Sequence, residues 1–111
     1  MWKAAIELGV HCYEATKAFP REETYGMTSQ IRRAAASVPA NIAEGHGREG
    51  TANFVQFLRV AQGSLKELET HLILSQRVDL IDEARCQALL GECDEIGRMV
   101  RALIRSLQEK T

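Results

Sequence analysis

The sequence is poor in several features that mark particular protein classes. Its 111 residues include only 2 Pro and 5% aromatic residues. No apolar run approaches the roughly 18 residues of a membrane-spanning helix, and Glu7 interrupts the N-terminus before a signal peptide could form. The 3 Cys (Cys12, Cys86 and Cys93) are an odd number, and no pair has the C-x-x-C spacing of a zinc or redox motif. We therefore expect a cytoplasmic protein with reduced thiols in its core and no membrane partner.

An excess of charge of one sign is also missing. Lys and Arg total 14 and Asp and Glu total 15, which gives a net charge of -1. This balance argues against a protein that binds polyanions through overall basicity. The 45% hydrophobic and 26% charged residues are typical of a globular chain, and the length predicts a single domain over residues 1–111.

The pattern that is present is helical. Apolar residues recur with a period near 3.6, and strand-like alternation is nearly absent. The clearest predicted helix covers residues 51–77, with one seam made by Phe54, Leu58, Ala61, Leu65, Leu68, Leu72 and Ser75. Residues 82–108 predict a second long helix with Asp82 as its N-cap and a seam made by Cys86, Leu89, Cys93, Ile96, Val100, Leu103 and Leu107. The short connection at residues 78–81 predicts an antiparallel hairpin.

Two further helices are expected. Residues 2–18 place Trp2, Ile6, Gly9, Tyr13 and Thr16 on one face, and Phe19-Pro20 ends this helix. Residues 28–44 place Ile31, Ala34, Ala35, Val38 and Ile42 on one face. Pro39 lies inside that helix and predicts a kink, and Gly45 is its expected C-cap. The fold class predicted is all-α, an antiparallel up-down-up-down four-helix bundle.

Both long helices carry apolar residues beyond one seam. These are Phe57, Val60 and Ile73 in the first, and Leu90, Gly97 and Ile104 in the second. Such stripes are either a wide core-facing surface or a subunit interface. We favour the interface.

The segment from Gly45 to Gly50 is a literal G-x-G-x-x-G. It follows a predicted helix and not a strand, so no β-α-β unit exists to bind a dinucleotide. A weaker alternative remains, because the next helix begins at Thr51 and its N-terminus favours anions, to which His46 and Arg48 would add donors.

Enzyme chemistry has little support. Glu7 and His11, like Glu67 and His71, are four residues apart, whereas the di-iron motif of helical bundles is Glu-x-x-His. We interpret them as surface pairs and keep a metal-dependent enzyme only as a remote alternative. No cofactor, small-molecule substrate or catalytic residue is expected.

Arginines form two clusters. Arg98, Arg101 and Arg105 follow one face of the last helix, and Arg32 and Arg33 are adjacent in the second. A stripe of cations is what RNA or DNA contacts, but cations near a helix C-terminus also complement its dipole. Nucleic-acid contact therefore stays open beside a purely structural role.

The run FPREETYGMTSQIRRAAASVPANIAEG, from Phe19 to Gly45, together with Gly63-Ser64-Leu65, resembles the bacterial four-helix-bundle family encoded in intervening sequences of 23S ribosomal RNA genes. The resemblance covers nearly the whole chain. The family is similar in fold to the accessory variability protein of diversity-generating retroelements, and both are known as homopentamers. The resemblance thus implies a ring of five copies, and in the retroelement branch a positively charged surface that binds nucleic acid and a reverse transcriptase. The net charge of -1 departs from that branch.

Several positions match the family pattern, and none of them is catalytic in the family: Gln30, Arg32, Arg33, Pro39, Asn41, Glu44, Gly45, Gly63 and Ser64. Gly63 and Ser64 suit close helix approach, and Asn41 and Glu44 are expected to accept hydrogen bonds from backbone donors near Pro39 and the following loop. If Glu44 accepts buried hydrogen bonds, Glu44→Ala should destabilise the fold by roughly 1 to 3 kcal/mol. The sequence thus predicts a non-enzymatic, self-associating binding or scaffolding module, with a nucleic-acid-binding accessory factor as the rival.

Overall fold

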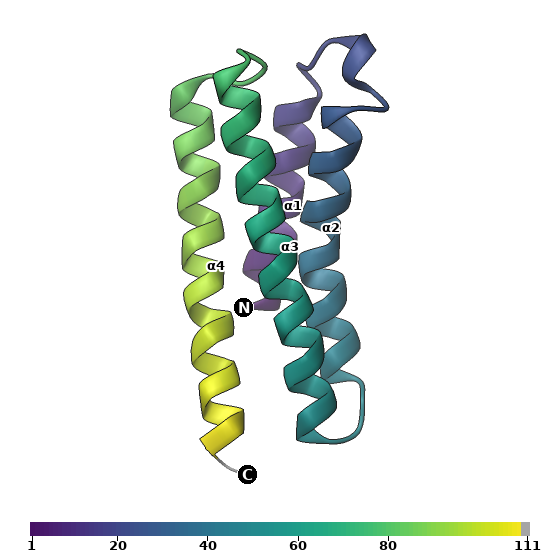
Figure 1. The fold of residues 1–111 in the computed structure, drawn as a ribbon, viewed down its shortest axis with the longest axis vertical. Helices are drawn as coiled ribbons and strands as arrows, with labels where there is room; N and C mark the ends of the chain where they lie inside the picture. The colour runs from purple at the N-terminus through teal and green to yellow at the C-terminus, as the bar shows by residue number, and fades with distance from the viewer. Residues whose placement is uncertain (110–111) are drawn as a thin grey trace.

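The computed structural model describes residues 1–109, and these residues form helices and no strands (Figure 1). The helices are α1 (Trp2–Thr16), a 3-10 turn η1 (Arg21–Glu23), α2 (Met27–His46), α3 (Thr51–Arg77) and α4 (Glu83–Glu109). The molecule is elongated, with extents of 47 × 23 × 19 Å. The predicted all-α class and the existence of four long helices are confirmed. None of the described helices combines the length and the apolar character needed to cross a bilayer.

The helices form a closed square. α1 packs against α2 and α4, and α3 packs against the same two, while within the described residues neither diagonal pair makes contact. Figure 1 shows the α1–α2 and α3–α4 connections at one end of the molecule and the α2–α3 loop at the other. α1 has 15 residues against 27 in α3 and α4, and it begins part-way along them. The end of the molecule with the α2–α3 loop is therefore built from three helices only.

The predicted boundaries are close to those observed. α3 has the predicted bounds, and α4 begins one residue after Asp82, whose Oδ1 accepts a hydrogen bond from the Arg85 backbone N–H at 2.7 Å. This contact confirms Asp82 as the N-cap. α1 ends two residues earlier than expected, and α2 continues two residues further, to His46.

The seams of the long helices are largely confirmed. In α3, Leu58, Leu65 and Leu68 are among the six seam residues that are buried, and Phe54 is half-buried against them. In α4 the seam is buried from Cys86 to Val100. α2 buries the face predicted from its sequence, which consists of Ile31, Ala34, Ala35, Val38 and Ile42.

The face of α1 that the sequence marks is mostly not its buried face. Its buried residues are Ala5, Leu8, Cys12, Ala15 and Thr16. Of the predicted face only Thr16 is buried, and Trp2, Ile6 and Tyr13 stay well exposed. α1 has two apolar stripes, and the one with smaller side chains faces the core because it lets α2 and α4 approach closely.

Helical structure continues through Pro39, which is buried, as expected for a proline inside the helix, and the kink stays a prediction. One expectation about α2 is wrong. Gly45 is not a C-cap: it lies inside the helix, and the C-cap is Gly47. A Cβ on Gly45 would lie 2.7 Å from the Phe57 Cβ and 3.0 Å from the Phe54 Cδ1. The glycine is needed because α3 packs directly against it.

Candidate functional site

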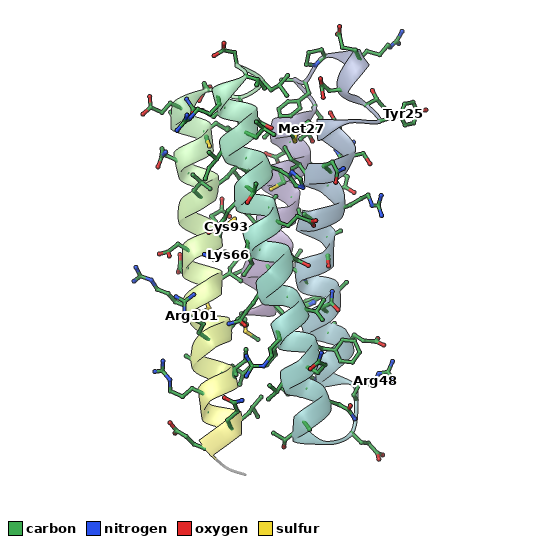
Figure 2. The ribbon with its side chains drawn as sticks, viewed as in Figure 1. Tyr25, Met27, Arg48, Lys66, Cys93 and Arg101 are labelled. Carbon is green, nitrogen blue, oxygen red and sulfur yellow. The ribbon has the colours of Figure 1, made fainter. Side chains whose placement is uncertain are left out.

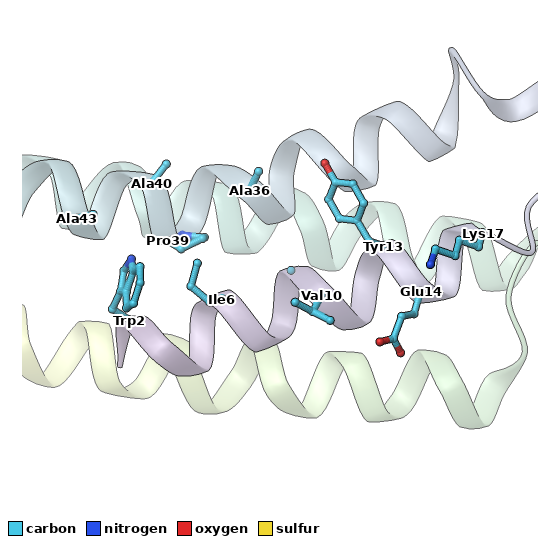
Figure 3. Close-up of a pocket in the computed structure, with 11 residues that line it drawn as sticks. Trp2, Ile6, Val10, Tyr13, Glu14, Lys17, Ala36, Pro39, Ala40 and Ala43 are labelled. Atoms are coloured by element: carbon cyan, nitrogen blue, oxygen red, sulfur yellow. The ribbon is translucent and has the colours of Figure 1, made fainter.

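An apolar groove runs between α1 and α2, with a volume of about 660 Å³. On its α1 side stand four large, well exposed side chains: Trp2 (46%), Ile6 (37%), Val10 (44%) and Tyr13 (44%). Its α2 side is small and rigid, formed by Ala36, Pro39, Ala40 and Ala43. Figure 3 shows Trp2 and Ile6 pointing toward Pro39. Gly9 keeps the centre open, since a Cβ there would meet nothing within 4 Å. We call this surface the α1/α2 groove.

The groove continues into a second apolar hollow of about 490 Å³ below the start of α1. Trp2 and Ala43 line both hollows, and the second adds Phe54 and Leu103 from the long helices. Its origin is the short α1, which leaves no fourth helix to cover these side chains. The two hollows together form one apolar surface along the α1 and α2 side of the molecule.

The upper end of the groove is held by Arg32. Its guanidinium lies 4.6 Å from the centre of the Tyr13 ring, and its Nε donates a hydrogen bond to Thr16 Oγ1 at 2.9 Å. These contacts fix Tyr13 in place and join α2 to the C-terminal end of α1. Beyond it, Tyr25 projects from the turn after η1 with 97% of its surface exposed (Figure 2).

A third hollow lies between α3 and α4 and has a volume of about 400 Å³. We call it the α3/α4 notch. Gly63 and Gly97 face it from the two helices, and the cations Arg59, Lys66 and Arg101 line it. Figure 2 shows Cys93, Lys66 and Arg101 following one another along this boundary. Arg101 was a predicted contact residue, whereas Arg59 and Lys66 were not, because they belong to no cluster along the chain and share a surface with Arg101 only across the helix pair.

The predicted anion contacts separate into two groups. Four of the seven side chains already contact other residues of the same molecule. Arg32 binds α1 as described, Arg48 pairs with Glu44 at 2.6 Å and lies over the Phe57 ring, Arg98 pairs with Asp94 at 3.1 Å, and the His46 ring meets the edge of Phe54. Arg33, Arg101 and Arg105 are exposed and form no ion pair among the described residues. The structure does not bring the seven together at one surface.

The predicted interface stripe is also divided. Gly97 and Ile104 are buried within a single chain, so they expose little surface for a contact between subunits. Phe57 and Leu90 are half-buried, and only Val60 (44%) and Ile73 (45%) are well exposed. The wide-core alternative therefore accounts for part of the stripe. The larger exposed apolar surface is the α1/α2 groove, of which Val10 was missed although it is four residues from Ile6.

Some of the residues that match the family pattern have structural roles. Ser37 and Ser64 join α2 to α3 through a hydrogen bond of 2.7 Å between their hydroxyls, and Asn41 Nδ2 donates to the Ser37 carbonyl and hydroxyl. Asn41 thus acts as a donor to the carbonyl of a preceding turn and not as an acceptor. Glu44 is exposed and paired with Arg48, so the expectation that it accepts buried hydrogen bonds is wrong. Gln30 is exposed.

The two Glu/His pairs considered as metal ligands do not come together in the structure. His11 contacts Glu92 of α4 at 2.9 Å and Glu7 at 3.9 Å, whereas Glu67 and His71 lie on α3, which does not contact α1. Among the described residues no group of three His, Cys, Asp or Glu side chains is placed to hold a metal ion.

The thiols are free and buried. Burial raises the pKa of Cys12 to about 12 and also raises the pKa values of Cys86 and Cys93. Thiols in this state are protonated at neutral pH and are poor nucleophiles.

Comparison with known proteins agrees with this architecture. Residues 1–102 match the model of a family described as 23S rRNA-intervening sequence protein. A crystal structure of a protein of unknown function from the S23 ribosomal protein family of Bacteroides thetaiotaomicron is similar to this chain with a TM-score of 0.84. It is 24% identical, and the alignment covers 93% of this chain and 96% of the other, which shows a shared fold. No curated protein matches the sequence.

Proposed function

The chain belongs to the 23S rRNA-intervening sequence protein family, and on that premise we propose that it is a non-enzymatic scaffold whose copies bind one another through the α1/α2 groove. The proposal includes the antiparallel up-down-up-down helix order and a ring of five copies, as the family resemblance implies. The buried free thiols support the cytoplasmic location expected from the sequence.

The observation that carries the proposal is the exposed face of α1. Trp2, Ile6, Val10 and Tyr13 are 37 to 46% exposed and lie side by side on one helix. Large apolar side chains that gather on one surface of a small chain mark a site of association. A chain of 111 residues buries only about two-thirds of its unfolded surface, so burying this face against another copy adds to its core.

The occupant we commit to is a second copy of the chain. The groove has small residues along α2, which let a partner helix approach closely, and its apolar surface continues into the hollow beside Phe54 and Leu103. The net charge of -1 leaves little repulsion between copies. A contact between two different surfaces closes into a ring when the rotation between neighbours divides a full turn.

Sedimentation velocity of Val10→Glu tests the proposal. A carboxylate in the groove must be desolvated on association, so this variant should sediment as a monomer while the natural chain sediments as an oligomer of five copies. Val60→Glu is the matched control, because Val60 on α3 is also 44% exposed but lies on the stripe predicted from sequence. It should leave the oligomer intact.

Two outcomes reject the proposal. If the natural chain is a monomer at micromolar concentration, self-association is wrong. If Val60→Glu dissociates the oligomer and Val10→Glu does not, the interface lies on α3.

A further inference from the structure

The α3/α4 notch has a glycine from each helix in its wall. Gly63 on α3 and Gly97 on α4 both line it. A Cβ on Gly63 would meet nothing within 4 Å, so the space in front of it is open. Glycine inside a helix destabilises it relative to alanine, and the close packing that explains Gly45 is absent at Gly63, so the expectation that Gly63 allows close helix approach is wrong.

Arg101 turns into the notch. Its Nη1 lies only 3.5 Å from the position that a Cβ on Gly97 would occupy, so the guanidinium lies back against its own helix. Arg59 lines the same hollow from α3. Neither arginine forms an ion pair among the described residues, in contrast to Arg98 and Arg48. Two guanidinium groups from different helices thus share one cavity and have no carboxylate to neutralise them.

Other charges along the notch are paired. Lys66 lies near the middle and pairs with Glu69 at 3.1 Å, and Asp94 pairs with Arg98 at 3.1 Å. The two carboxylates that line the notch, Glu69 and Asp94, are thus each paired with a cation. An anion entering the notch is attracted to Arg59 and Arg101, whose charges no ion pair among the described residues neutralises.

We propose that the α3/α4 notch binds a phosphate group, held between Arg59 and Arg101. A planar guanidinium donates paired hydrogen bonds to two oxygens of a phosphate. Two guanidinium groups together balance the charge of a phosphate that carries one or two negative charges. The volume of about 400 Å³ lies at the lower end of the range for small-molecule sites, so it admits a phosphate with an attached sugar. Leu65 and Cys93 supply an apolar wall for that attached group.

The site does not depend on self-association through the α1/α2 groove, because it is formed by the other two helices. A phosphate in the notch would also explain why Arg101 has no ion pair among the described residues. From the sequence, Arg101 was expected to form one stripe with Arg98 and Arg105. Of these three, only Arg101 lines the notch.

Binding is measured with three probes: inorganic phosphate and AMP by calorimetry, and a short fluorescein-labelled single-stranded RNA by anisotropy. Arg101→Gln removes one guanidinium, and Arg105→Gln is the matched control, one turn further along α4 and outside the notch. Gly63→Leu fills the hollow without changing charge. Its control is Gly91→Leu on α4, where an added Cβ also meets nothing within 4 Å. Circular dichroism checks that all four variants keep their helix content.

Arg101→Gln and Gly63→Leu should each weaken binding by about tenfold or more, and the controls should change it less than about twofold. Binding of AMP and phosphate identifies a free phosphate ligand. Binding of RNA alone, weakened by the same two variants and by rising salt, identifies the phosphate of a polynucleotide backbone. The proposal is overturned if no probe binds, or if each notch variant behaves like its control.

Discussion

At the scale of single residues, the glycines inside helices show how closely neighbouring helices pack. Four glycines lie within α2, α3 and α4 at Gly45, Gly63, Gly91 and Gly97, and their surroundings differ. Gly45 is closed in by Phe57 and Phe54, whereas the space before Gly63 and Gly91 is open. The sequence alone did not predict these surroundings, because the residues beside a glycine in the chain do not say which helix packs against it.

Gly45→Ala should destabilise the protein. The new methyl group would lie 2.7 Å from the Phe57 Cβ, and one of the helices must shift to admit it. Overpacking of this kind costs about 1 to 3 kcal/mol, which urea denaturation resolves. Gly91→Ala is the control, since its methyl group meets open space and alanine favours helix, so its stability should rise by up to about 1 kcal/mol. Equal stability of the two variants would show that α2 and α3 are not packed this closely.

At the scale of helices, the sequence predicted all four helices, but it indicated the buried face of α1 less well than those of the other three. α3 and α4 each have one dominant seam of alternating three- and four-residue steps, so period alone identified both their bounds and their buried faces. α1 has two stripes with the same period, one of small residues and one of large ones. The sequence marked the stripe with Trp2 and Tyr13, whereas the stripe of smaller side chains is the buried one, because burial is decided by how closely neighbouring helices approach. The stripe of large residues is therefore exposed and available for the proposed contact between copies.

The start of α4 depends on one side chain. Asp82 accepts the hydrogen bond from the Arg85 N–H at 2.7 Å, and its negative charge also suits the helix N-terminus. Asp82→Ala should lower the free energy of unfolding by about 1 kcal/mol. Asp82→Asn, which keeps an accepting oxygen, should remain within a few tenths of the natural chain. Thermal unfolding of both variants checks this, and an unchanged midpoint for the alanine variant would contradict it.

At the scale of the whole molecule, the two surfaces to which we assign functions lie on different helix pairs. The α1/α2 groove is apolar and the α3/α4 notch is cationic, although the chain as a whole is nearly neutral. Overall charge argued against polyanion binding from composition alone, but Arg59 and Arg101 concentrate positive charge locally by folding. A local site of this kind depends on the distance between side chains on two different helices. A pattern along the sequence does not give that distance.

The unequal lengths of the helices have a dynamic consequence. Near the α3–α4 turn each layer of the bundle is closed by four helices, whereas Leu103 and Leu107 at the far end of α4 lack one neighbour and are only partly buried. Fewer buried contacts lower the free energy of local opening. Hydrogen exchange should therefore show amides near residue 103 opening at lower free energy than amides near Leu89, so that the molecule unravels from one end. Uniform protection along α4 would contradict this. Association over the hollow beside Leu103 would slow that opening, which couples the fluctuation of one end of the chain to its assembly.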